Sequence, residues 1–74
     1  MTYYEERNKA LAELNKILTL AKERKIDVSI PSIMIEFSCK YAISDKVIEE
    51  QLDRYQKLWD DMSIDRQKGV IKFQ

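Results

Sequence analysis

Apolar residues recur every three or four positions in two long stretches of this chain, which is the spacing of helices that bury one face. The first stretch, from Thr2 to Lys25, predicts one long helix. The second, from Ser29 to Trp59, predicts two helices joined by the short turn 41–44. The chain is therefore predicted to be mainly α-helical, with three helices.

Two shorter stretches alternate apolar and polar residues, which is the pattern of half-buried strands. Residues 26–30 predict a short edge strand between the first two helices. Residues 62–73 predict a β-hairpin turned at 67–69, where Gly69 supplies the residue with a positive φ angle. The predicted order is helix, strand, helix, helix, strand, strand, in a single domain of residues 1–74 with a small core.

Residues that favour helix starts stand where these helices are expected to begin. Thr2 is the expected N-cap of the first helix, Ser29 or Ser32 of the second and Ser44 of the third. Pro31 is compatible with the first turn of the second helix, because the N–H groups of that turn lack helical partners.

The second predicted helix is apolar on two opposite sides. On one side lie Ile30, Ile33, Met34, Phe37 and Tyr41. Ile35 and Cys39 lie nearly opposite, together with Ala42, and Glu36 and Lys40 form a narrow polar strip. Two interpretations follow: the helix is sandwiched between its neighbours, or Ile35 and Cys39 belong to a partner-binding patch.

The third predicted helix has one apolar and one charged side. Its apolar side predicts that Tyr55 and Trp59 are shielded by packing on the first helix, at Leu11, Leu14 and Leu18. Its charged side includes Glu49, Glu50 and Asp53, with Glu50 to Arg54 and Asp53 to Lys57 at the four-residue spacing of helical ion pairs.

Charge is unevenly distributed although the formal net charge is zero. Residues 44–61 hold three basic and six acidic side chains, whereas residues 62–74 hold three basic and one acidic. Arg66 and Lys68 lie at the tip of the predicted hairpin, where they either contact phosphates or belong to an ordinary solvated turn.

The residues needed for most catalytic chemistry are missing. The chain has no histidine, one cysteine and no glycine-rich loop, and its neighbouring carboxylates diverge on helices rather than converge on a metal. We therefore expect no enzyme activity, no catalytic residue, no metal and no cofactor. The start of the chain lacks the pattern of a secretory signal and no apolar run approaches a membrane span, so a cytoplasmic location is expected.

The stretch from Ser29 to Trp59 resembles a helix-turn-helix, and the order of elements resembles a winged-helix domain. The stretch departs from that pattern at Ala42, where helix-turn-helix proteins often carry a glycine. The resemblance implies a three-helix domain with a small β-hairpin. It implies either a DNA-binding transcriptional regulator, with Arg66 and Lys68 as candidate phosphate contacts, or a module that docks on another protein.

In its small size, acidic third helix and lack of a basic face, the chain is also similar to small accessory subunits of crenarchaeal family-B DNA polymerase holoenzymes. That similarity implies a noncatalytic archaeal subunit that docks on a larger protein, such as a replicative DNA polymerase. We expect docking through Ile35, Cys39, Glu49, Glu50 and Asp53. In a DNA-binding relative the third helix would enter the major groove, so its acidic residues predict weak or no binding of duplex DNA. A homodimer is also compatible with the sequence.

Overall fold

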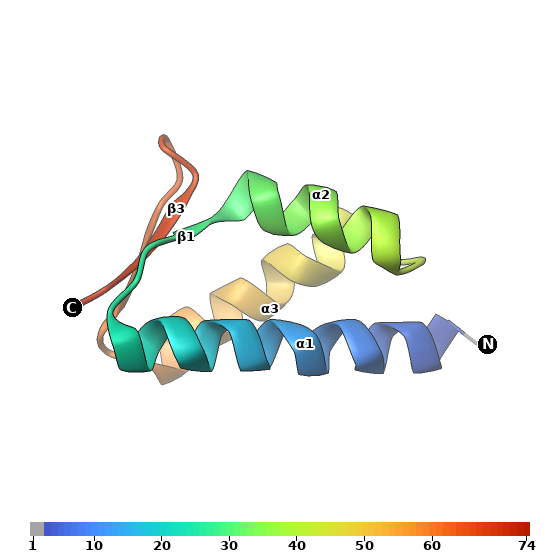
Figure 1. The fold of residues 1–74 in the computed structure, drawn as a ribbon, viewed down its shortest axis with the longest axis horizontal. Coiled ribbons are helices and arrows are strands. Elements are labelled where there is room, and N and C mark those ends of the chain that lie inside the picture. Colours follow the sequence, from blue (N-terminus) through green and yellow to red (C-terminus); the bar gives the residue numbers. More distant parts are fainter. Residues whose placement is uncertain (1–2) are drawn as a thin grey trace.

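Three helices and three short strands follow one another in the predicted order in the computed structural model, which describes residues 3–74. The elements are α1 (Tyr3–Arg24), β1 (Val28–Ser29), α2 (Ile30–Lys40), α3 (Asp45–Leu58), β2 (Met62–Asp65) and β3 (Val70–Phe73). Helix α1 runs along the length of the molecule, and the strands gather at one end (Figure 1). The prediction of a mainly helical domain with a small β-hairpin is confirmed in these terms.

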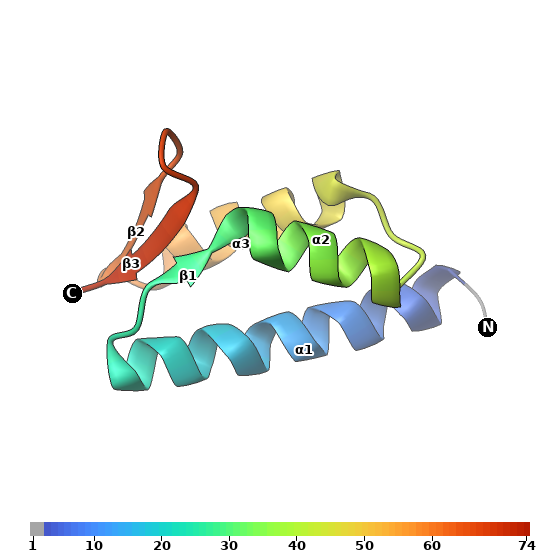
Figure 2. The same cartoon turned by 45° about the horizontal axis from the view of Figure 1, so that its top comes forward.

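The strands form one antiparallel sheet in the order β1-β3-β2. In β1, Val28 faces Ile71 of β3, and the N–H of Ile30 donates to the carbonyl oxygen of Gly69 at 2.8 Å. Strands β2 and β3 form the predicted hairpin, which rises beyond the start of α2 (Figure 2). Gly69 has the predicted positive φ angle, +67°.

Helix α2 begins as its sequence predicts. The Ser29 side chain accepts a hydrogen bond from the backbone N–H of Ser32 at 3.4 Å, and Pro31 lies in the first turn. Ser44 is the N-cap residue of α3, as predicted, but its hydroxyl makes no capping bond, and its carbonyl oxygen instead accepts from the N–H of Val47. The expected cap at Thr2 lies outside the described residues.

A left-handed residue ends α1, whereas the turn after α2 needs none. After α1, Lys25 has a φ angle of +54° and the N–H of Ile26 donates to the carbonyl oxygen of Ala21 at 2.9 Å. This six-to-one hydrogen bond around a left-handed residue is the Schellman motif, usually built with glycine. The turn 41–44 joins α2 and α3 as predicted and contains no residue with positive φ, so Ala42 fits it without strain.

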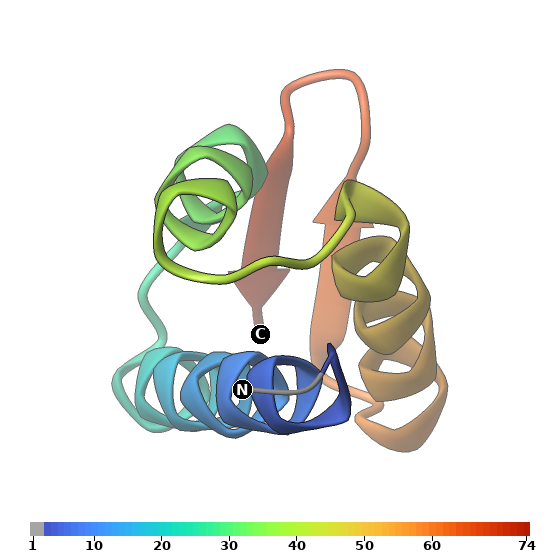
Figure 3. The ribbon, with the colours of Figure 1, turned by 90° about the vertical axis from the view of Figure 1, so that its right-hand side faces the viewer.

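The core lies where the three helices meet the inner face of the sheet (Figure 3). Its buried residues are Ala10, Leu14, Leu18, Ala21, Ile33, Phe37, Ile48, Leu52, Tyr55, Met62, Ile71 and Phe73. Tyr55 is shielded, as predicted, in the same core as Leu14 and Leu18, but Leu11, the third predicted partner, is not part of that core. The Tyr55 hydroxyl donates to the side-chain oxygen of Asn15 at 2.9 Å. The prediction for Trp59 holds only in part, because that ring is half-buried.

Candidate docking surfaces

Helix α2 packs on the molecule through one of its two apolar faces. Ile33 and Phe37 are buried, at 4% and 1% exposure, whereas Ile35 on the other face is 67% exposed. Cys39, one turn further along, is exposed as well. The interpretation in which α2 is sandwiched between its neighbours is therefore wrong, because no element of the described chain covers the face that carries Ile35.

The rim of this face is held in place by ion pairs. The Nζ atom of Lys40 lies 2.7 Å from a carboxylate oxygen of Glu13 on α1 and 3.9 Å from one of Glu36. The hydrogen bond to Glu13 raises the pKa of Lys40 above its ordinary value. The ion pair with Glu13 joins the end of α2, next to Cys39, to α1.

The acidic side chains of α3 form a second exposed surface. Glu49, Glu50 and Asp53 are all exposed, and α2 and α3 lie on different sides of the bundle (Figure 3). The structure thus presents the residues predicted for docking as two surfaces, one apolar and one acidic. We call them the α2 face (Ile35 and Cys39) and the α3 acidic face (Glu49, Glu50 and Asp53).

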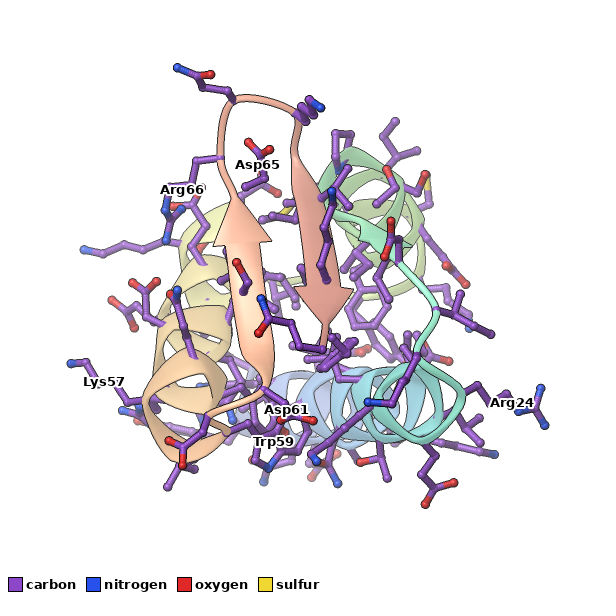
Figure 4. The ribbon with its side chains drawn as sticks, turned by 90° about the vertical axis from the view of Figure 1, so that its left-hand side faces the viewer. Arg24, Lys57, Trp59, Asp61, Asp65 and Arg66 are labelled. Carbon is purple, nitrogen blue, oxygen red and sulfur yellow. The ribbon has the colours of Figure 1, made fainter. Side chains whose placement is uncertain are left out.

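Asp53 is partnered by the hairpin and not by its own helix. A guanidinium nitrogen of Arg66 lies 2.6 Å from a carboxylate oxygen of Asp53. The predicted pair of Asp53 with Lys57 is not formed, and neither is the predicted pair of Glu50 with Arg54. In Figure 4 Lys57 extends away from α3 and Arg66 lies over that helix. Residue spacing along α3 could not predict this contact, because the direction of the Arg66 side chain depends on the turn at the tip of the hairpin.

The hairpin tip holds the two candidate phosphate contacts in different settings. A carboxylate oxygen of Asp65 accepts hydrogen bonds from the backbone N–H groups of Gln67 and Lys68, each at 3.1 Å. This local turn directs Arg66 back to Asp53 and leaves Lys68 exposed at the tip. The structure therefore does not bring the side chains of Arg66 and Lys68 together into one phosphate-binding site.

A cluster at the other end of the hairpin joins β2, α3 and α1. The rings of Tyr55 and Trp59 are stacked, with centroids 4.7 Å apart, and the Nζ atom of Lys22 lies 5.8 Å from the Trp59 ring centroid. The same Nζ atom lies 3.0 Å from a carboxylate oxygen of Asp61. This hydrogen bond lowers the pKa of Asp61 below its ordinary value. The basic end of α1 thus has a tertiary partner that its sequence did not indicate.

A third surface was missed by the sequence pattern altogether. A shallow apolar groove at the end of α1 and the start of β1 is lined by Ile17, Leu20, Ala21, Arg24, Ile26 and Val28. Leu20 lies off the face of α1 that buries Leu14, Leu18 and Ala21, and it is 42% exposed; Ile26 is 51% exposed. In the sequence, the sign of this groove was an apolar residue, Leu20, outside the three- and four-residue spacing of the buried face. We call this surface the α1–β1 groove.

Two further searches cover the part of the chain that the structure describes. Within residues 3–74 no cluster of three or more His, Cys, Asp or Glu side chains could hold a metal ion. Over the same residues no helix combines the length and the apolar character needed to span a membrane.

Known proteins add no further constraint. Comparisons of the chain with protein-family models, with curated proteins and with solved structures each return no match.

Proposed function

We propose that this protein is a noncatalytic interaction subunit with a winged-helix architecture. It docks on a larger protein of a DNA-processing complex, such as a DNA polymerase, through the α2 face. The observation that carries this proposal is the exposure of Ile35, at 67%, on a helix whose opposite face is fully used by the core. The polymerase is the partner that the resemblance of the sequence favours.

The α2 face has apolar residues bordered by charged ones, as the middle of a protein interface does. Protein interfaces combine a desolvated apolar centre with a polar rim. Ile35 and Cys39 supply apolar surface, and the Glu36–Lys40–Glu13 ion pairs border it. Because Ile35 is 67% exposed, burying it against a partner would contribute roughly 1–2 kcal/mol from the hydrophobic effect, which approaches the scale of an interface hot spot.

The α3 acidic face contributes to association in a different way. Glu49 and Glu50 form no ion pair with any residue from 3 to 74. Their charge can therefore attract a basic surface over long distances, which raises association rates more than affinity. Reversing both charges is expected to slow association at low salt, with a smaller effect at high salt.

A second candidate function is a winged-helix DNA-binding transcriptional regulator. The element order and the exposed Lys68 at the hairpin tip favour it. Two features oppose it: the α3 acidic face would meet the phosphate charge of a duplex, and Arg66 is already paired with Asp53. We therefore place the docking function first.

Affinity capture from a lysate of the source organism tests the proposal. The wild-type protein is expected to retain a larger protein, identified by mass spectrometry, that Ile35→Asp fails to retain. Leu58→Asp is the matched control, because Leu58 is as exposed as Ile35, at 73%, but lies at the end of α3. Equal capture by the Ile35→Asp variant, or capture of no protein at all, would reject docking through the α2 face.

A further inference from the structure

The α1–β1 groove combines apolar walls with an open strand edge. Leu20 on α1 and Ile26 before β1 are the exposed apolar residues of its lining, and they are 42% and 51% exposed. The groove encloses about 270 Å³, below the roughly 300–1,000 Å³ of sites that enclose small molecules. Its size suits the anchoring of one or two side chains.

The Schellman motif at the end of α1 builds one wall of the groove. Lys25 turns the chain back, and the hydrogen bond from Ile26 to Ala21 brings Ile26 over the last turns of the helix. Such motifs normally place the residue after the turn in apolar contact with the helix. Ile26 and Val28 both line the groove, and Asp27 between them is exposed.

The other wall lies beside an unpaired strand edge. Strand β1 is at the edge of the sheet, and its partner β3 lies on one side only. Because the N–H of Ile30 points to Gly69 and successive residues of a strand direct these groups to opposite sides, the N–H of Ser29 faces the open edge. An extended segment laid along β1 can accept that hydrogen bond.

Arg24 is the charged residue among the six that line the groove. Arg24 lines the groove and forms no ion pair with any residue from 3 to 74. Its side chain projects from the end of α1 into solvent in Figure 4. A carboxylate on an occupant of the groove would complement this guanidinium.

The small lining argues against a second copy of the chain as the occupant. Stable interfaces use roughly 20–30 residues from each partner, whereas this groove is lined by six. We propose that the α1–β1 groove binds a short extended segment of a partner protein, with apolar side chains at alternate positions and an acidic residue close to them. This site is separate from the α2 face and does not depend on the function proposed for it.

Selection from a phage-displayed library of random short peptides tests the site. Selection on the wild-type protein is expected to enrich peptides with two alternating apolar residues and a nearby Asp or Glu. A selected peptide, titrated into isotope-labelled protein, is expected to shift the amide NMR signals of Leu20, Ile26 and Val28 in a saturable way. Replacing its acidic residue by the amide should weaken binding roughly two- to fivefold, the range for an exposed ion pair.

Three variants make the result decisive. Leu20→Asp is expected to abolish binding of the selected peptide. Arg24→Gln should bind the acidic and amide peptides equally. Ile35→Asp should bind like the wild type, which separates this site from the α2 face. If Leu20→Asp does not fold, Arg24→Glu replaces it and is expected to bind the acidic peptide more weakly than the amide peptide, the reverse of the wild-type preference. The proposal would be overturned if no peptide were enriched, or if the enriched peptides were basic or carried apolar residues at the four-residue spacing of a helix. It would also be overturned if the NMR signals of the groove residues shifted with protein concentration alone.

Discussion

Lys25 and Gly69 both have positive φ angles, +54° and +67°, yet only one of them is a glycine. Gly69 is under two constraints, because a Cβ atom there would also lie 3.1 Å from the Cδ atom of Pro31. At Lys25 the left-handed conformation is imposed by the Schellman motif, in which glycine is the usual residue. The two positions therefore predict opposite effects of gaining and losing a Cβ atom.

Gly69→Ala is expected to destabilise the domain by about 1–2 kcal/mol, the cost of a left-handed conformation for a residue with a Cβ atom. Crowding against Pro31 adds to this cost. Lys25→Gly is the matched counterpart and is expected to stabilise by up to about 1 kcal/mol, because relief of strain outweighs the extra entropy of the unfolded chain. Urea unfolding of both variants measures these changes, and a neutral Gly69→Ala would show that the hairpin tip moves freely away from α2.

The pair of Asp61 with Lys22 predicts a dependence of stability on acid. The pKa of Asp61 in the folded protein lies below its ordinary value of 3.8. Its ion pair therefore stabilises the folded state above that value, and the stabilisation is lost as the pH falls through the lower folded pKa. The difference in unfolding free energy between wild type and Asp61→Asn should shrink on acidification from neutral pH. A difference that stays constant to the acid limit would contradict this role of Asp61.

At the scale of the elements, spacing in the sequence predicted which residues share a face but not which face has a neighbour. The two sides of α2 were assigned correctly, yet only the structure shows that Ile33 and Phe37 face the core while Ile35 is left exposed. The same limit hid the α1–β1 groove, because the path of the chain after Lys25 decides that Ile26 lies beside α1. Contacts such as Arg66 with Asp53 depend on turn geometry that spacing does not encode.

The junction of α3 with the sheet is expected to carry much of the stability. Trp59 stacks on Tyr55 and lies 6.3 Å, between ring centroids, from Phe73. Because Trp59 is half-buried, Trp59→Ala is expected to cost roughly 2–4 kcal/mol, somewhat less than a fully buried tryptophan. Chains of this length have total stabilities of about 4–11 kcal/mol, so this loss is a large fraction.

Leu58→Ala is the control for Trp59→Ala, since Leu58 is the neighbouring residue and is 73% exposed. It is expected to change the unfolding free energy by no more than about 0.5 kcal/mol. Thermal unfolding followed by circular dichroism compares the two variants. Equal melting temperatures for Trp59→Ala and the wild type would show that the aromatic cluster does not hold α3 to the sheet.

At the scale of the whole molecule, the distribution of charge separates the two candidate functions. The acidic α3 face and the ion pair that holds Arg66 predict weak or no binding of duplex DNA. Fluorescence anisotropy with a labelled duplex, at low and moderate salt, measures this. Tight binding with a steep salt dependence, altered by Glu49→Gln and Glu50→Gln in a sequence-specific manner, would instead favour the DNA-binding regulator.

We propose that the α2 face lies inside an interface with a larger protein, and Cys39 allows this docking to be tested at the site itself. Cys39 is the chain's one cysteine and is exposed one turn from Ile35. A photo-crosslinker attached to its sulfur, irradiated in a lysate of the source organism, is predicted to join the protein to one larger partner. The product should disappear with Ile35→Asp, and also when the crosslinker is moved to the end of α3 by Cys39→Ser with Leu58→Cys. A crosslinked product that forms equally from both positions, or none from Cys39, would contradict docking through the α2 face.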